Sequence, residues 1–109
     1  MQYESYRKEF LQEFIRNGGF ATRAFRAVVD CADTLPANTL RARASDLLNN
    51  PITQKNLKAI LKRRIESDKR VTMRLLASAG LVEFAVKAWG IADTFALYER
   101  KQRENWGEE

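Results

Sequence analysis

Two arginines near the middle of the chain, Arg41 and Arg43, are placed to hold an acidic ligand. An α-helix turns once in about 3.6 residues, so they would flank a face of mostly small or polar side chains. An arginine fork matches phosphate oxygens or a guanine edge, and small side chains allow close approach. The pattern predicts a helix that lies against a duplex; an ordinary surface helix is the alternative. That face carries Asn38, Thr39, Ala42, Ser45, Asp46 and Asn49.

The segment that follows carries the densest positive charge. From Lys55 to Arg74, eight Lys or Arg residues stand against Glu66 and Asp68, which gives this window a formal charge of +6. The whole chain has a formal net charge of +5 and a pI of about 9.7. This balance favours acidic partners such as nucleic acid or an anionic membrane, and a solvated helix face is the alternative. The cations expected to attract a DNA backbone are Lys55, Lys58, Lys62, Arg63 and Arg64.

Residues used in most catalytic and metal chemistry are missing. The sequence has no histidine and a single cysteine, Cys31, so it can form neither an internal disulfide nor a zinc site. It has no glycine-rich phosphate loop, no GxSxG turn and no evident acid–base pair of carboxylates. We therefore predict a protein that is not an enzyme and that needs no metal or cofactor. Cys31 stands among Val28, Val29 and Ala32, which predicts a buried side chain.

The elements that must position these residues follow from apolar periodicity, which predicts an all-α protein with a compact bundle of about four helices. Asn17-Gly18-Gly19 ends the first helix, because glycine takes the left-handed conformation without steric cost. Asn50 as an N-cap and Pro51 as the first helical residue begin the fourth helix. The predicted helices are Glu4–Arg16, Phe20–Ala32, Ala37–Leu48 and Pro51–Glu66.

From Val71 onward the chain is apolar over more than one helix face. It predicts one long helix or a helical hairpin, with Ser67 as N-cap and breaks at Gly80 or Gly90. A helix that is apolar on most of its faces must be buried against another surface. In a protein of this size, that surface is either the first four helices or a second copy of the chain. The tail "RKQRENWGEE" is expected to fray. The residues predicted at an interface between copies are Leu76, Val82, Phe84, Val86, Trp89, Ile91 and Phe95.

We accordingly divide the chain into a bundle that binds DNA, residues 1–66, and a helical oligomerisation element, residues 67–109. Glu83, Lys87 and Asp93 interrupt the apolar stretch, which argues against a membrane span. The opening "MQYESYRKEF" has no apolar segment of the kind found in signal peptides. The sequence therefore predicts a cytoplasmic protein with no membrane partner.

Roughly residues 7–65 resemble the N-terminal DNA-binding region of bacteriophage terminase small subunits. That family opens with an aromatic-rich helix, here "RKEFLQEFI", then a glycine break and an Ala-Thr helix, here "GGFATRAFRA". A helix that ends in Leu-Leu-x-Asn-Pro follows, here "SDLLNNP", and then an amphipathic helix, here "ITQKNLKAIL". This chain differs in a longer turn before Pro36 and in Asp46, where the family usually has an arginine.

The resemblance implies a helix-turn-helix built from Phe20–Ala32 and Ala37–Leu48. It further implies binding of viral double-stranded DNA, assembly into a homo-oligomeric ring, and delivery of the DNA to a large ATPase–nuclease subunit in the host cytoplasm. The third helix would meet the groove or its phosphates, with support from arginines of the second and attraction from cations of the fourth. The residues expected at DNA are Arg23, Arg26, Asn38, Thr39, Arg41, Arg43, Lys55, Lys58, Lys62, Arg63 and Arg64.

Two other functions are compatible with the same residues. The first is a dimeric helix-turn-helix regulator of phage or prophage origin, which the mass of the assembly separates from a ring. The second is a protein-interaction module, such as a small phage inhibitor of a host complex, that uses the apolar C-terminal surface. A module of that kind would show no salt-dependent binding to DNA.

Overall fold

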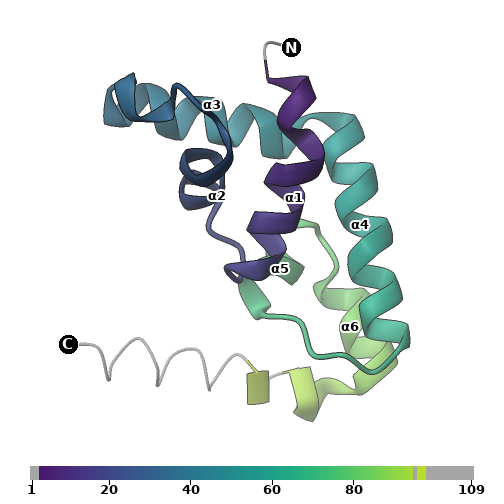
Figure 1. The fold of residues 1–109 in the computed structure, drawn as a ribbon. Coiled ribbons are helices and arrows are strands. Elements are labelled where there is room, and N and C mark those ends of the chain that lie inside the picture. The colour runs from purple at the N-terminus through teal and green to yellow at the C-terminus, as the bar shows by residue number, and fades with distance from the viewer. Residues whose placement is uncertain (1–2, 95, 98–109) are drawn as a thin grey trace, which may run out of the picture. The chain divides into compact units, whose positions relative to one another are not determined.

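The described part of the chain consists of helices and the segments that join them. The computed structural model describes residues 3–94 and 96–97, and none of these forms a strand. The predicted all-α class is therefore confirmed for these residues. Residues 91–94 are helical, and the other helices of Figure 1 are α1 (Arg7–Arg16), α2 (Ala21–Val28), α3 (Ala37–Asn49), α4 (Pro51–Glu66), α5 (Met73–Ser78) and α6 (Val82–Trp89), with 3-10 turns η1 (Glu4–Tyr6) and η2 (Ala32–Thr34).

The chain divides into two compact units, Met1–Leu57 and Lys58–Glu109. The division falls within α4, so the first turns of this helix belong to the first unit and the remaining turns to the second. Compactness does not assign function, and the functional boundary between residues 66 and 67 therefore stays a prediction.

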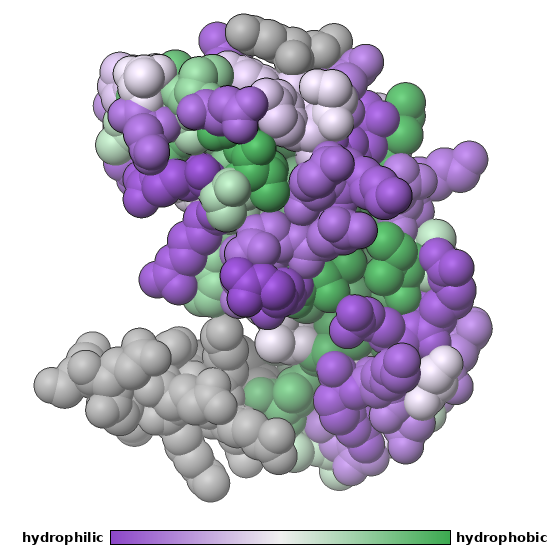
Figure 2. Space-filling view, viewed as in Figure 1, coloured by the Kyte–Doolittle hydropathy of each residue, from purple (hydrophilic) through white to green (hydrophobic). Residues whose placement is uncertain are grey.

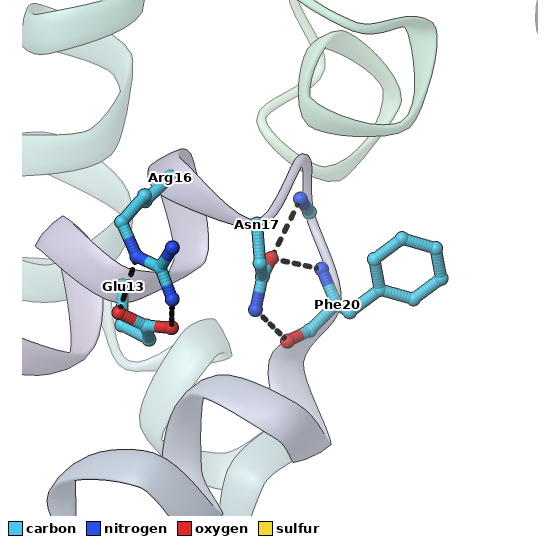
Figure 3. Close-up of polar contacts among 5 residues, drawn as sticks. Glu13, Arg16, Asn17 and Phe20 are labelled. Carbon is cyan, nitrogen blue, oxygen red and sulfur yellow. Dashed lines mark hydrogen bonds and ion pairs between the residues drawn. The ribbon is translucent and has the colours of Figure 1, made fainter.

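The turn between α1 and α2 is organised by one side chain, Asn17 (Figure 3). Its Oδ1 accepts hydrogen bonds from the backbone N–H groups of Gly19 (3.1 Å) and Phe20 (2.8 Å). Its Nδ2 donates to the carbonyl oxygen of Phe20 at 3.0 Å. The predicted break is thus confirmed. Asn17 satisfies the polar groups of the turn and sets the point at which the chain enters α2.

An ion pair closes the last turn of α1, where Arg16 and Glu13 face each other (Figure 3). The guanidinium donates from Nε to Glu13 Oε2 at 2.9 Å and from Nη2 to Oε1. Hydrogen bonding from Arg16 lowers the pKa of Glu13 from its ordinary value of 4.5. Because the pKa of Glu13 is lower in the folded chain than in the unfolded chain, the ion pair stabilises the fold at pH values above the ordinary pKa. This stabilisation is lost as the pH falls through the lowered pKa.

The core of the first unit is aromatic and lies where α1 packs on α2 and α2 packs on α3. Phe25 meets the ring of Tyr3 edge-on, with the ring centroids 5.0 Å apart, and Phe10 stacks on Phe14 at 5.8 Å. The helical spacing of Leu40, Ala44, Leu47 and Leu48 predicts one buried face on the third helix. The first three are buried and Leu48 is half-buried, so this face locks α3 to the unit. The buried residues of these three helices are Phe10, Leu11, Phe14, Ala24, Phe25, Leu40, Ala44 and Leu47.

The second helix is shorter than predicted, since α2 ends at Val28 instead of Ala32. Val29 has an extended backbone, with ψ 121°, yet its side chain is buried, as is that of Ala32 in the turn η2. The apolar residues whose spacing predicted a longer helix are therefore buried through a turn instead. The backbone change exposes Cys31, so the prediction that Cys31 is buried was wrong.

Helix α4 ends at Glu66 as predicted, but the next helix does not begin at Ser67. Asp68 adopts a left-handed conformation with φ 57°, while the N–H of Lys69 donates to the carbonyl of Arg64 at 2.8 Å. Ser67 and Asp68 thus close α4 in the way a helix C-terminus usually closes, and do not begin the next helix. The N-cap of α5 is Thr72, whose side-chain oxygen accepts from the N–H of Leu75 at 3.2 Å.

A single long C-terminal helix is not what the structure shows. Helices α5 and α6 are six and eight residues long and contact each other within the second unit. Gly80 has φ 66° and Gly90 has φ 93°, conformations that residues with a side chain rarely adopt. The N–H of Leu81 donates to the carbonyl of Leu76 at 2.8 Å and so completes the end of α5. The chain therefore breaks at both glycines.

Candidate nucleic-acid interface

The outward face of α3 carries the residues that were predicted to meet DNA. Asn38, Ala42, Ser45 and Asn49 are all exposed, as are Arg41 and Arg43 on the two edges of the face; Thr39 is half-buried. Because the opposite face is locked into the core by Leu40, Ala44 and Leu47, the direction of this surface is set by packing.

Hydrogen bonds along this face orient its polar side chains. Arg41 donates from Nη2 to Asn38 Oδ1 at 3.4 Å, and Asn49 donates from Nδ2 to Ser45 Oγ at 3.2 Å. Both bonds are exposed and link residues one helical turn apart, so a duplex can replace them without disturbing the core. The small side chain of Ala42 between them leaves room for close backbone approach.

The other edge of the face has mixed charge. Arg43 Nη1 lies 3.9 Å from Asp46 Oδ2, and both side chains are well exposed. The pairing of this arginine was not predicted from the sequence. The spacing of three residues between opposite charges was a signal that could have shown it.

The two arginines of α2 that were predicted to support DNA contact are also exposed. The guanidinium carbon of Arg23 lies 4.7 Å from the centroid of the Phe20 ring, so the stem of this side chain is held at the start of α2. Arg26 lies one helical turn further on. Helix α2 packs directly on α3, and all of these residues belong to the first unit.

The cations of α4 are exposed along the helix, and hydrophilic side chains predominate along α4 on the face visible in Figure 2. Lys55, Lys58 and Lys62 recur at spacings that place them on one side of the helix. Lys62 Nζ also lies 5.4 Å from the ring centroid of Phe84, within the second unit. Lys55 belongs to the first unit, whereas Lys58, Lys62, Arg63 and Arg64 belong to the second.

A polar network braces the corner between α3 and α4, and sequence reasoning missed it. Arg7 of α1 donates from Nε to Thr53 Oγ1 at 3.1 Å and from Nη2 to Asn50 Oδ1 at 3.5 Å. Gln54 Nε2 donates to the carbonyl of Leu48 at 3.0 Å, across the corner. The available signal was Thr53, a polar residue in the buried register of α4, four positions before Leu57. This network positions α3 relative to α1.

Replacing Thr53 by Val is expected to lower the free energy of unfolding by about 1.5 kcal/mol, because it removes the buried acceptor of a charged donor. Urea unfolding followed by circular dichroism measures the change. The control is a double-mutant cycle with Arg7→Met, in which a coupling of about 1 kcal/mol is expected. Equal losses from Thr53→Val in both backgrounds would show that the hydrogen bond contributes nothing to stability.

The predicted oligomer residues differ in exposure. Ile91 is 62% exposed, and Val82, Phe84, Val86 and Trp89 are half-buried. Leu76 is fully buried within its own chain and has no surface for a second copy, which corrects its assignment to the interface. Phe95 lies outside the described residues. Trp89 is covered by Arg70, whose guanidinium carbon lies 4.6 Å from its ring centroid.

Arg70 also pairs with acidic residues of its own unit. Its Nη2 lies 3.5 Å from Asp93 Oδ2 and 3.9 Å from Asp68 Oδ1. The pair with Asp93 ties the segment after α4 to the helical residues 91–94. Arg70 is therefore engaged with two carboxylates and an aromatic ring of its own unit.

Neither a metal site nor a membrane-spanning helix is found among the described residues. They contain no group of three or more His, Cys, Asp or Glu side chains that could hold a metal ion. No helix among them combines the length and the apolar composition that a bilayer span requires. In comparisons with known proteins, no family model, no curated protein and no solved structure matches this chain.

Proposed function

We propose that this chain is a non-enzymatic DNA-recognition protein, the small subunit of a viral genome-packaging terminase. It binds viral double-stranded DNA, assembles as a ring and presents the DNA to the large ATPase–nuclease subunit. The observation that carries the proposal is the outward face of α3, on which exposed Arg41 and Arg43 flank the small side chains of Ala42 and Ser45. Arginine donors beside small side chains suit contact with phosphates and base edges.

In this proposal α2 and α3 are the two helices of the helix-turn-helix, and α3 is the recognition helix. Their direct packing supports the assignment. Residues 29–36 join them, which makes eight residues, longer than the three or four of most such motifs. A short turn would fix the position of α3 relative to α2. Here the packing of α3 through its buried residues Leu40 and Leu47 fixes that position instead. Arg23 and Arg26 of α2 then reach phosphates beside the groove.

The remaining parts of the proposal rest on charge and apolar exposure. The exposed cations of α4 add attraction to the DNA backbone that does not depend on sequence. In the second unit, the exposed side chain of Ile91 and the partly exposed Phe84 and Val86 supply apolar surface for contact between copies. The terminase assignment itself rests on the resemblance of residues 7–65.

The experiment is a fluorescence-anisotropy titration of a random-sequence duplex at several salt concentrations, together with native mass spectrometry with and without DNA. We expect the logarithm of the binding constant to fall linearly with the logarithm of the salt concentration, because the lysines and arginines of the protein displace counterions from the DNA phosphates. We also expect a ring, many times the chain mass of 12.6 kDa. A dimer that binds DNA would favour the regulator. Absence of salt-dependent binding would overturn DNA recognition and favour the protein-interaction module.

A further inference from the structure

The pair formed by Arg43 and Asp46 on α3 contributes little to holding the fold together. Arg43 Nη1 lies 3.9 Å from Asp46 Oδ2, the residues are one helical turn apart, and the side chains are 48% and 61% exposed. Exposed pairs of this kind contribute little to stability. A carboxylate on a face that approaches DNA also repels phosphates, so its presence there needs another explanation.

The pair displays hydrogen-bond donors beside an acceptor. In the major groove a G·C base pair presents two acceptors, N7 and O6 of guanine, followed by a donor, the N4 amino group of cytosine. The Arg43 fork can donate to the two acceptors while the Asp46 carboxylate accepts from the amino group. An A·T pair presents an acceptor, adenine N7, then a donor, the adenine N6 amino group, and then a second acceptor, thymine O4. In the same register, thymine O4 would face the Asp46 carboxylate, which is also an acceptor.

We propose that Arg43 and Asp46 act together as a reader of a G·C base pair in the major groove, an inference that rests on the proposed function. Arg43 supplies affinity for guanine. Asp46 supplies discrimination, because at an A·T pair read in the same register its carboxylate faces the thymine O4 acceptor and is left without a donor. Asp46 thus weakens non-specific binding and raises the ratio of specific to non-specific affinity.

The test compares two duplexes of equal length, alternating inosine–cytosine and alternating adenine–thymine. Inosine lacks the 2-amino group of guanine, so both duplexes present the same acceptors in the minor groove and differ in the major groove. We expect the wild-type chain to bind the inosine–cytosine duplex at least about five-fold more tightly. In Asp46→Asn we expect this preference to fall below about two-fold, with tighter binding of the adenine–thymine duplex.

The matched control is Glu9→Gln, which removes one exposed negative charge from a different helix, α1. It should keep the wild-type preference. A preference that is the same in the wild type and in Asp46→Asn, with both proteins binding DNA, would overturn the reader while leaving the proposed function intact. Failure of both proteins to bind either duplex at low salt would overturn the proposed function, and the reader with it.

Discussion

Reversing the charges of Arg41 and Arg43 together, to Glu, is expected to weaken duplex DNA binding by about 100-fold at moderate salt. Each arginine is placed to make a charge-assisted contact worth about 1.5 kcal/mol or more, and removing two such contacts corresponds to roughly that factor. Both side chains are exposed, while the core face of α3 is formed by Leu40, Ala44 and Leu47. The helical circular dichroism and the unfolding midpoint should therefore change little. Anisotropy titration against a duplex measures the effect.

The matched control is the double variant Lys8→Glu and Lys87→Glu. Both lysines are exposed and lie on α1 and α6, outside the proposed DNA surface. Each double variant lowers the formal net charge of +5 by four, so long-range attraction to DNA falls equally in both. A reduction of affinity that is the same in the two double variants would show that net charge, and not the α3 face, governs binding.

Neutral variants separate phosphate contact from long-range attraction. Changing Arg41 and Arg43 to Gln should reduce the salt slope of the logarithm of the binding constant by about one, because Arg41 neutralises a phosphate whereas Arg43 donates to a base edge. A large drop in affinity with an unchanged slope would place the two arginines at base edges. Unchanged affinity would remove α3 as the recognition helix.

Replacing Phe25 by Ala is expected to lower the free energy of unfolding by about 3–5 kcal/mol. Phe25 is fully buried on α2, the helix that packs on both α1 and α3, and its ring packs edge-on against Tyr3 with centroids 5.0 Å apart. Ala leaves a cavity and removes this ring contact. Since small domains are stable by roughly 5–15 kcal/mol, much of the population of the variant should be unfolded on mild warming. Urea unfolding monitored by circular dichroism gives the difference.

The control for this change is Phe25→Leu, which keeps most of the apolar volume and should lose less than half as much stability. We also expect Phe25→Ala to weaken DNA binding at temperatures where it is partly unfolded, because α3 is then no longer held by α2. A loss below about 1 kcal/mol would mean that the surrounding side chains collapse into the cavity, and that the aromatic core does not hold the first unit.

Much of the first unit could be predicted because its signals are local. The buried stripe of α3 and the start of α4 at Pro51 follow from residues within one or two helical turns. The glycine break after α1 was predicted for the same reason, although the three hydrogen bonds of Asn17 were not. Exposure of Arg41 and Arg43 was predictable once the buried stripe was known.

Other features depended on contacts between residues far apart in the chain, which periodicity does not record. Arg7 and Thr53 are 46 positions apart, so their hydrogen bond was invisible until α1 and α4 were placed. Val29 is buried through a turn after α2, because the chain can satisfy apolar spacing with more than one backbone conformation. Leu76, one of many apolar residues after Val71, is buried within its own chain.

The sequence by itself therefore determines the positions of the first four helices to within a few residues, the positive charge of the fourth helix and the absence of histidine, since helix propensity and charge depend on the residues themselves and their neighbours. Which apolar residues are buried, and which donors meet which acceptors, depends on packing between helices. Packing places Leu76 inside and leaves Ile91 exposed, although both belong to the same apolar stretch of sequence. The physical reason is that burial is decided by the surfaces that meet in three dimensions, and not by the hydrophobicity of a side chain alone.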